Sequence, residues 1–247
     1  MKKFFNWQVT LGVLLIGLSI AFYLLHYSIF HDAHHIFLYL IGDIGFLFLD
    51  VLIVTMVLHR LLEYRDKQAV LNKLNMVIGT FFSEVGTELL KRFSQFDQGL
   101  TQIAKNLVIT KDWSDKEFAA GRKAVKDHAS DLDSKTGNLA EVKAFLVGKR
   151  PFMLSLLENP NLLEHESFTE LLWAVFHLTD ELAHRKDISK LPDSDYKHLS
   201  GDIKRAYQQL IVQWLDYMKH LKQDYPYLFS LAMRTNPFDV NASVEVK

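Results

Sequence analysis

Histidine and carboxylate side chains recur along one stretch of the chain at spacings that place them on a single helix face. These residues are Glu170, His177, Asp180, Glu181 and His184, at positions i, i+7, i+10, i+11 and i+14. Imidazole and carboxylate groups bind divalent transition metals, and helical bundles build di-metal sites from such groups on facing helices. Those sites use a Glu-x-x-His spacing on paired helices, which this stripe lacks. A metal-dependent enzyme with His177, Glu181 and His184 as ligands is therefore an alternative hypothesis, and a solvated polar face is the preferred interpretation.

A second group of histidines surrounds a short polar segment between two apolar runs. His31, Asp32, His34 and His35 lie there, with His26 just before them. Imidazoles at this density could bind a transition metal ion or titrate near neutral pH. However, the adjacent His34 and His35 cannot easily aim at one ion, and the spacing matches no standard metal site. We favour polar side chains at a tight interfacial turn, with metal binding as the alternative.

Two aspartates lie inside an apolar run that is long enough to cross a membrane. Asp43 and Asp50 are seven residues apart, so on a helix they share one face and are separated by roughly 10 Å along the axis. A charge at membrane depth costs at least about 2.5 kcal/mol, so such residues usually face a protein interior or a wet cavity. One hypothesis is a cation path formed by several subunits, as in a channel or transporter. The preferred interpretation is that Asp43 is hydrated near the outer surface and that a protonated Asp50 hydrogen-bonds across a helix interface.

The rest of the sequence offers no established catalytic motif. There is no cysteine, which excludes disulfides, thiolate metal sites and cysteine nucleophiles. A glycine-rich phosphate loop and a G-x-S-x-G turn are also absent. The 28 basic residues are balanced by 29 acidic ones, and no basic region stands out that would attract nucleic acid. We therefore predict no cofactor and no nucleic-acid partner, and we favour a binding protein over an enzyme.

Two apolar segments near the N-terminus have the length and composition of membrane spans. The first is predicted over residues 5–30, after Lys2 and Lys3, and it lacks a signal-peptide cleavage site. The second, 36–58, is long enough at about 1.5 Å per residue to cross a hydrocarbon core of about 30 Å. Residues 31–35 between them include no Lys or Arg, whereas basic residues flank the opposite ends of both spans. The positive-inside rule then predicts a two-pass protein of the inner (plasma) membrane with both termini in the cytoplasm.

The second span continues without a helix breaker into an amphipathic stalk, residues 61–93. The stretch 76–82 is apolar nearly all round, so it should be packed on several sides, by the rest of the domain or by another subunit. A straight rod through span and stalk would be roughly 87 Å long, so we expect a bend at Gly79 or Gly86. The apolar stripe of the stalk recurs at three or four residues and comprises Leu71, Leu74, Ile78, Phe81, Val85 and Leu89.

The remaining chain shows helical periodicity and no strand-like alternation. We predict an all-α fold with a transmembrane region at 1–60, the stalk at 61–93, a cytoplasmic helical domain at 94–237 and a flexible tail at 238–247. The longest soluble helix carries a wide aromatic face and should be central to the bundle. The predicted helices are 98–107, 114–129, 139–157, 167–184, 200–223 and 228–233, with Pro160 and Pro192 as breaks and Ser167 as a helix cap paired with Glu170.

Two segments resemble uncharacterised bacterial two-pass membrane proteins. They read LHRLLEYRDKQAVLNKLNMVIGTFFSEVGTELL at residues 58–90 and YPYLFSLAMRTNPFD at residues 225–239. The resemblance implies the architecture and carries no activity, cofactor or catalytic residue. The leading hypothesis is thus a bilayer-anchored, homo-oligomeric protein whose cytoplasmic helical module binds or scaffolds a protein partner.

Overall fold

The computed structural model describes residues 2–128, 132–160, 162 and 165–245, and the side chains of residues 2–6, 8 and 68–73 lie outside this description. The chain divides into two compact units, Met1–Asp66 and Lys67–Lys247, which are described separately below. The described residues are mostly helical and form no strand beyond a single isolated bridge between Asp97 and Leu132. The predicted all-α class is therefore confirmed.

The first unit consists of two long apolar helices joined by a tight turn. Helix α1 covers Lys2–Phe30, and helix α2, Ala33–Phe81, begins in this unit. At the turn His31 takes a left-handed backbone conformation with φ of 50°. The Asp32 carboxylate then accepts a hydrogen bond from the backbone N–H of His35 at 3.1 Å, as an N-capping aspartate does. The segments Val9–Phe30 and Ala33–Lys67 are long and apolar enough to cross a membrane, and they contain the core of both predicted spans.

A π-helical turn separates α2 from the next helix. This turn, η1, covers Phe82–Gly86, and α3 covers Thr87–Ser94. Its last residue, Gly86, is one of the two positions at which the sequence predicts a bend. A Cβ atom at Gly86 would lie only 2.5 Å from the Phe82 ring, so the close turn requires glycine there.

The end of α2 belongs to the core of the second unit. Phe81 is fully buried and packs edge to face on Phe168 of α7, with ring centroids 5.3 Å apart. Phe82 stacks on Tyr217 of α8 at 5.0 Å. The stretch 76–82 is thus packed by its own domain, although Met76 itself stays exposed. All predicted stripe residues except Leu71, whose side chain is not described, are buried.

The described part of the second unit contains six further α-helices. They are α4 (Leu100–Ala104), α5 (Asp115–Asp127), α6 (Leu139–Leu157), α7 (Glu166–His184), α8 (Asp193–Asp224) and α9 (Pro226–Arg234). Most boundaries lie within a few residues of the predicted ones, and residue 129 of the second predicted helix lies outside the described residues. Helix α8 differs, because it begins directly after Pro192 rather than at Ser200.

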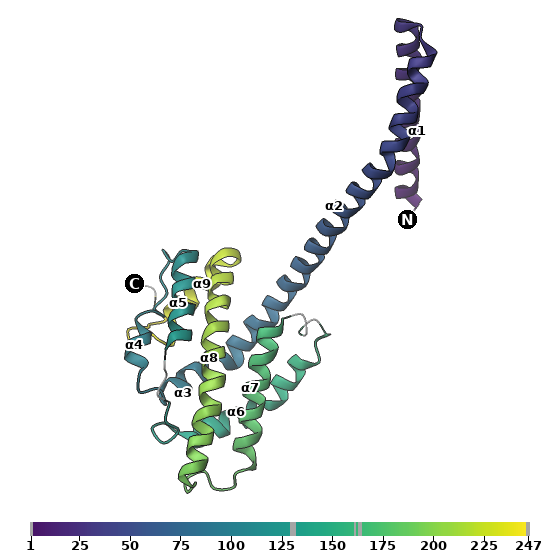
Figure 1. Cartoon of the computed structure of the whole chain (residues 1–247). Helices are drawn as coiled ribbons and strands as arrows, with labels where there is room; N and C mark the ends of the chain where they lie inside the picture. The colour runs from purple at the N-terminus through teal and green to yellow at the C-terminus, as the bar shows by residue number, and fades with distance from the viewer. Residues whose placement is uncertain (1, 129–131, 161, 163–164, 246–247) are drawn as a thin grey trace. The chain divides into compact units, whose positions relative to one another are not determined.

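Helix α8 is the centre of this unit. It contacts α3, α5, α7, α9 and the π turn, and Figure 1 shows it running between α5, α7 and α9. The predicted central position is therefore confirmed. The predicted inner face of this helix is buried in full, namely Ile203, Tyr207, Leu210, Trp214, Met218 and Leu221.

The predicted cap of α7 is wrong. The residue that caps it is His165, whose ring nitrogen Nδ1 accepts a hydrogen bond from the Phe168 backbone N–H at 3.3 Å. The Ser167 hydroxyl instead accepts a hydrogen bond from the Gln213 side chain of α8 at 2.8 Å. The Ser167 side chain, which the local sequence pattern predicts as a helix cap, therefore makes a contact between α7 and α8 instead.

Candidate functional site

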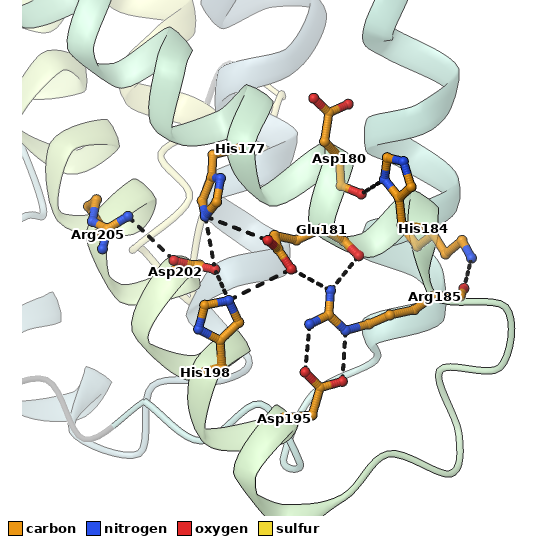
Figure 2. A network of polar contacts seen from close by, with 10 residues as sticks. His177, Asp180, Glu181, His184, Arg185, Asp195, His198, Asp202 and Arg205 are labelled. Atoms are coloured by element: carbon orange, nitrogen blue, oxygen red, sulfur yellow. Dashed lines mark hydrogen bonds and ion pairs between the residues drawn. The ribbon is translucent and has the colours of Figure 1, made fainter.

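The hairpin of α7 and α8 brings two histidines and two carboxylates together. His177 and Glu181 are one turn apart on α7, and His198 and Asp202 are one turn apart on α8. Figure 2 shows these four side chains pointing toward one another across the two helices. We call this set the histidine–carboxylate cluster.

The distances within the cluster converge on one oxygen of Asp202. Its Oδ2 lies 3.5 Å from Nε2 of His177 and 3.3 Å from Nε2 of His198. Among the described residues, His177, His198 and Asp202 form the one group in which a possible ligand atom from each lies within 4.8 Å of the others. Glu181 is next to them, with its oxygens 4.0 Å from His177 Nε2 and 3.7 Å from His198 Nε2.

Asp202 is buried although it is a carboxylate. Its side chain is only 4% exposed, whereas those of His177 and His198 are 47% and 51% exposed. Its Oδ1 accepts a hydrogen bond from Arg205 at 3.4 Å. Its Oδ2 has no hydrogen-bond partner, so the two nearby imidazoles approach it closely but without hydrogen-bond geometry. A buried charged oxygen without a donor is costly and calls for a compensating group.

Arg185 binds Glu181, one of the four members of the cluster. It follows the last residue of α7 and donates to both carboxylate oxygens of Asp195, and its Nη1 donates to Glu181 Oε2 at 2.7 Å. These hydrogen bonds lower the pKa of Glu181 and of Asp195 below their ordinary values and raise that of Arg185. Glu181 is therefore a carboxylate with its charge already matched by a cation.

The structure brings two of the three predicted metal ligands into the cluster and leaves the third outside it. His177 and Glu181 lie in the cluster, but His184 does not: its Nδ1 lies 2.7 Å from the backbone carbonyl of Asp180, and in Figure 2 it stands apart from the other two. The Asp180 side chain pairs with Arg150 at 3.3 Å. Glu170 lies at the other end of the helix, beside a pocket that Ser167 also lines.

Sequence reasoning missed two members of the cluster, His198 and Asp202. Their spacing, His-x-x-x-Asp, was a usable signal because residues four apart share a helix face. The predicted start of α8 at Ser200 removed His198 from the helix and hid that relation. Asp195, the partner of Arg185, was lost for the same reason.

The other predicted sites lie in the first unit. In the turn between α1 and α2, Asp32 caps α2, and His35 stacks on Tyr39 with ring centroids 4.7 Å apart, while the His26 and His35 rings are 6.1 Å apart. His31 and His34 are exposed. In the part of the chain that the structure describes, no three of these turn residues meet as closely as the cluster does.

Asp43 and Asp50 are both exposed. Asp43 lines, together with His26, a groove of about 600 Å³ between α1 and α2. Their roles as a cation path or as interface residues stay predictions.

Comparisons with known proteins identify the family. Residues 70–234 match the family described as "Uncharacterized protein MJ1433, C-terminal helical domain", and residues 2–62 match "MJ1433, N-terminal helical domain". The chain is 44% identical over 242 residues to "Uncharacterized protein MJ1433" of Methanocaldococcus jannaschii. The aligned region covers 98% of this chain and 97% of the relative. No solved structure matches. The resemblance to a family without an assigned function is thus confirmed, and the chain belongs to the MJ1433 family of helical proteins.

Proposed function

We propose that this chain is an integral membrane protein in which two spans anchor an all-α binding or scaffolding domain. The observation that supports this best is the exposure of the apolar side chains in α1 and in the first part of α2. No described residue is buried in the most apolar stretches of these helices, and Phe48, for example, is 73% exposed. Such a surface is unfavourable in water and favourable in lipid. The core helix of a soluble protein would instead be mostly buried.

The charges at the ends of the helices support the orientation. Lys2 and Lys3 precede α1, and Arg60, Arg65 and Lys67 follow the apolar part of α2, whereas the turn at residues 31–35 carries no Lys or Arg. By the positive-inside rule the turn lies outside and the helical domain lies in the cytoplasm.

Single-cysteine variants test this topology without background, because the chain has no cysteine. Ala33→Cys places a thiol at the exposed turn, and Val240→Cys places one at a residue that is 97% exposed near the C-terminus. In intact cells a membrane-impermeant maleimide should label only Ala33→Cys, and Val240→Cys should react after permeabilisation. The opposite labelling would reject the orientation, and extraction of the wild-type chain by alkaline carbonate would reject the anchor.

Open glycine faces support self-association in the membrane. A Cβ atom built on Gly17, Gly42 or Gly45 would meet nothing within 4 Å. Small residues let neighbouring helices approach closely in lipid, so these faces are suited to another copy of the chain. In mild detergent the protein should form a discrete oligomer that Gly17→Leu or Gly45→Leu dissociates and that Asp50→Asn only loosens. A wild-type monomer would contradict self-association.

An exposed tryptophan supports a cytoplasmic protein partner. Trp173 on α7 is 60% exposed, and tryptophan is enriched among the residues that dominate protein interfaces. A photo-cross-linking residue introduced at Trp173 should give a discrete adduct in native membranes, whereas the same residue at the exposed Lys197 should not. Equal, background labelling at both positions would count against a partner at this face.

The cation-path hypothesis remains a second candidate because Asp43 lines the groove between α1 and α2. Rings of carboxylates select cations in oligomeric pores. Liposomes that contain the purified oligomer should then show cation flux that Asp43→Asn or Asp50→Asn abolishes. Flux equal to that of empty liposomes at all pH values and voltages would leave the anchor as the function of the two spans.

A further inference from the structure

We propose that His177, His198 and Asp202 bind a divalent transition metal ion through Nε2, Nε2 and Oδ2. The proposal concerns the helical domain and does not depend on the membrane function proposed above. It differs from the ligand set that the sequence suggests, because His198 and Asp202 of α8 take the places of Glu181 and His184.

The distances suit a metal ion. Around a tetrahedral ion with bonds of about 2.0–2.1 Å, neighbouring ligand atoms lie about 3.3–3.4 Å apart. The two distances from Asp202 Oδ2 to the imidazole nitrogens are 3.5 Å and 3.3 Å. These two separations are about those that one bound ion would require, and all three ligand atoms lie within 4.8 Å of one another.

The hydrogen-bonding state of Asp202 favours an ion over simple ion pairs. Oδ2 of Asp202 has no hydrogen-bond partner, although the Nε2 atoms of His177 and His198 lie only 3.5 Å and 3.3 Å from it. Arg205 binds the other oxygen and so leaves Oδ2 facing the imidazoles. A cation between the three atoms would satisfy this buried carboxylate oxygen, which has no hydrogen-bond donor.

The surroundings allow the ion to enter and leave a coordination position open. The two histidines are about half exposed, so the site is accessible from solvent on their side. Three protein ligands with a free position are typical of metal sites that hold a water molecule, whereas structural zinc sites are closed by four ligands. Glu181 is next to the two imidazoles, but Arg185 already neutralises its charge, so we assign it a supporting position beside the ion.

The test is metal binding by the full-length protein in detergent. The outer-turn histidines could bind metal independently, so the background carries His31→Gln, His34→Gln and His35→Gln. Protein stripped by a chelator is titrated with Zn²⁺ against a chromophoric competitor, and with Co²⁺, whose tetrahedral complexes absorb strongly in the visible. We expect one Zn²⁺ ion per chain, a tetrahedral Co²⁺ spectrum and a rise of the melting temperature with Zn²⁺.

Matched variants decide which residues are ligands. Asp202→Asn and His198→Gln should weaken Zn²⁺ binding by more than about tenfold, because loss of residues that only support metal ligands already costs about 10- to 100-fold. His184→Gln removes a histidine from the same hairpin and should leave the affinity unchanged. Circular dichroism and the metal-free melting temperature show whether each variant is folded.

Three results would overturn the proposal. One is the absence of Zn²⁺ binding by the folded background protein. Another is equal affinity in Asp202→Asn and His184→Gln. The third is loss of binding in His184→Gln with Asp202→Asn unaffected, which would instead support the sequence-based ligand set.

Discussion

The guanidinium group of Arg185 grips the carboxylate of Asp195 with two parallel hydrogen bonds, Nη2 to Oδ1 at 2.6 Å and Nε to Oδ2 at 2.8 Å. Arg185 stands at the end of α7 and Asp195 in the first turn of α8, so this contact closes the hairpin. Nη1 also donates to the Glu181 backbone carbonyl at 2.5 Å, which satisfies a carbonyl of the last helical turn. The pair therefore ties the end of α7 to the first turn of α8.

Replacing Arg185 by lysine should destabilise the domain. Arg185→Lys keeps the charge but loses the planar fork, and the partly buried partners Glu181 and Asp195 lose hydrogen bonds. We expect a loss of about 1–2 kcal/mol in the free energy of unfolding. Urea denaturation measures it, with Arg150→Lys as the control, since that cation pairs with Asp180 at the surface and should change stability by less than about 0.5 kcal/mol. Equal effects of the two variants would contradict a special role for Arg185.

Removing the hydroxyl of Tyr207 should stabilise the domain. This side chain is 1% exposed, and its hydroxyl oxygen has no hydrogen-bond partner. Tyr207→Phe removes an unsatisfied polar group and should raise the free energy of unfolding by about 1 kcal/mol. Tyr227→Phe, at a residue that is 71% exposed, should change little. A destabilised Tyr207→Phe protein would reveal a hydroxyl contact that this structure lacks.

Stability should also fall in alkali because of Tyr207. Burial, with a smaller contribution from Asp97, raises its pKa in the folded protein above the ordinary value of 10.0. Above pH 10 the unfolded chain therefore loses the phenolic proton while the folded chain keeps it, which favours unfolding. The stability gap between Tyr207→Phe and wild type should widen between pH 9 and 11. A constant gap would mean that Tyr207 ionises equally in both states.

The start of α5 should contribute stability that depends on pH. Ser114 and Glu117 form a capping box, in which the Ser114 backbone N–H donates to Glu117 Oε2 at 2.7 Å. These hydrogen bonds lower the pKa of Glu117 below its usual 4.5, so the stabilisation is present above that pH and is lost as the pH falls. Ser114→Ala should lower the melting temperature at pH 7 and have a smaller effect at pH 3. Ser155→Ala removes a hydroxyl that donates to the Phe152 backbone carbonyl, so it should show no such pH dependence.

The end of α2 should behave as core rather than as a free stalk. Phe81→Ala should cost about 3–5 kcal/mol, because the side chain is fully buried among aromatic neighbours. Met76→Ala, on the same helix but 68% exposed, should stay within about 0.5 kcal/mol. Denaturation curves of the two proteins provide the comparison, and similar small effects would place this segment outside the folded domain.

Local patterns in the sequence were sufficient to predict most of the helices and their buried faces. The apolar runs predicted α1 and the first part of α2, and the three-to-four periodicity predicted the buried face of α8 around Tyr207 and Trp214. Both signals depend on residues close in sequence, where the helix period alone decides the outcome.

The candidate site was harder to predict, because it depends on polar residues that pair across helices. The first turns of α8, from Asp193, have only Tyr196 and Leu199 as apolar residues before Ile203, although acidic residues there and the preceding Pro192 are compatible with a helix start. Contacts such as Arg185 with Asp195 or Gln213 with Ser167 require the relative placement of α7 and α8. That placement arises from packing of the whole domain, which no local pattern encodes.

The π-helical turn at Phe82–Gly86 works as a one-residue insertion. The Thr87 N–H bonds back to the Phe82 carbonyl, five residues earlier, so the chain on either side is offset by about 100° around the helix axis relative to a continuous α-helix. With this offset, Phe81 before the turn and Leu90 after it are both buried. Deletion of the exposed Ser83 would restore an uninterrupted helix but would rotate one of these two faces out of the core. The domain therefore depends on the number of residues in this turn as much as on their identity.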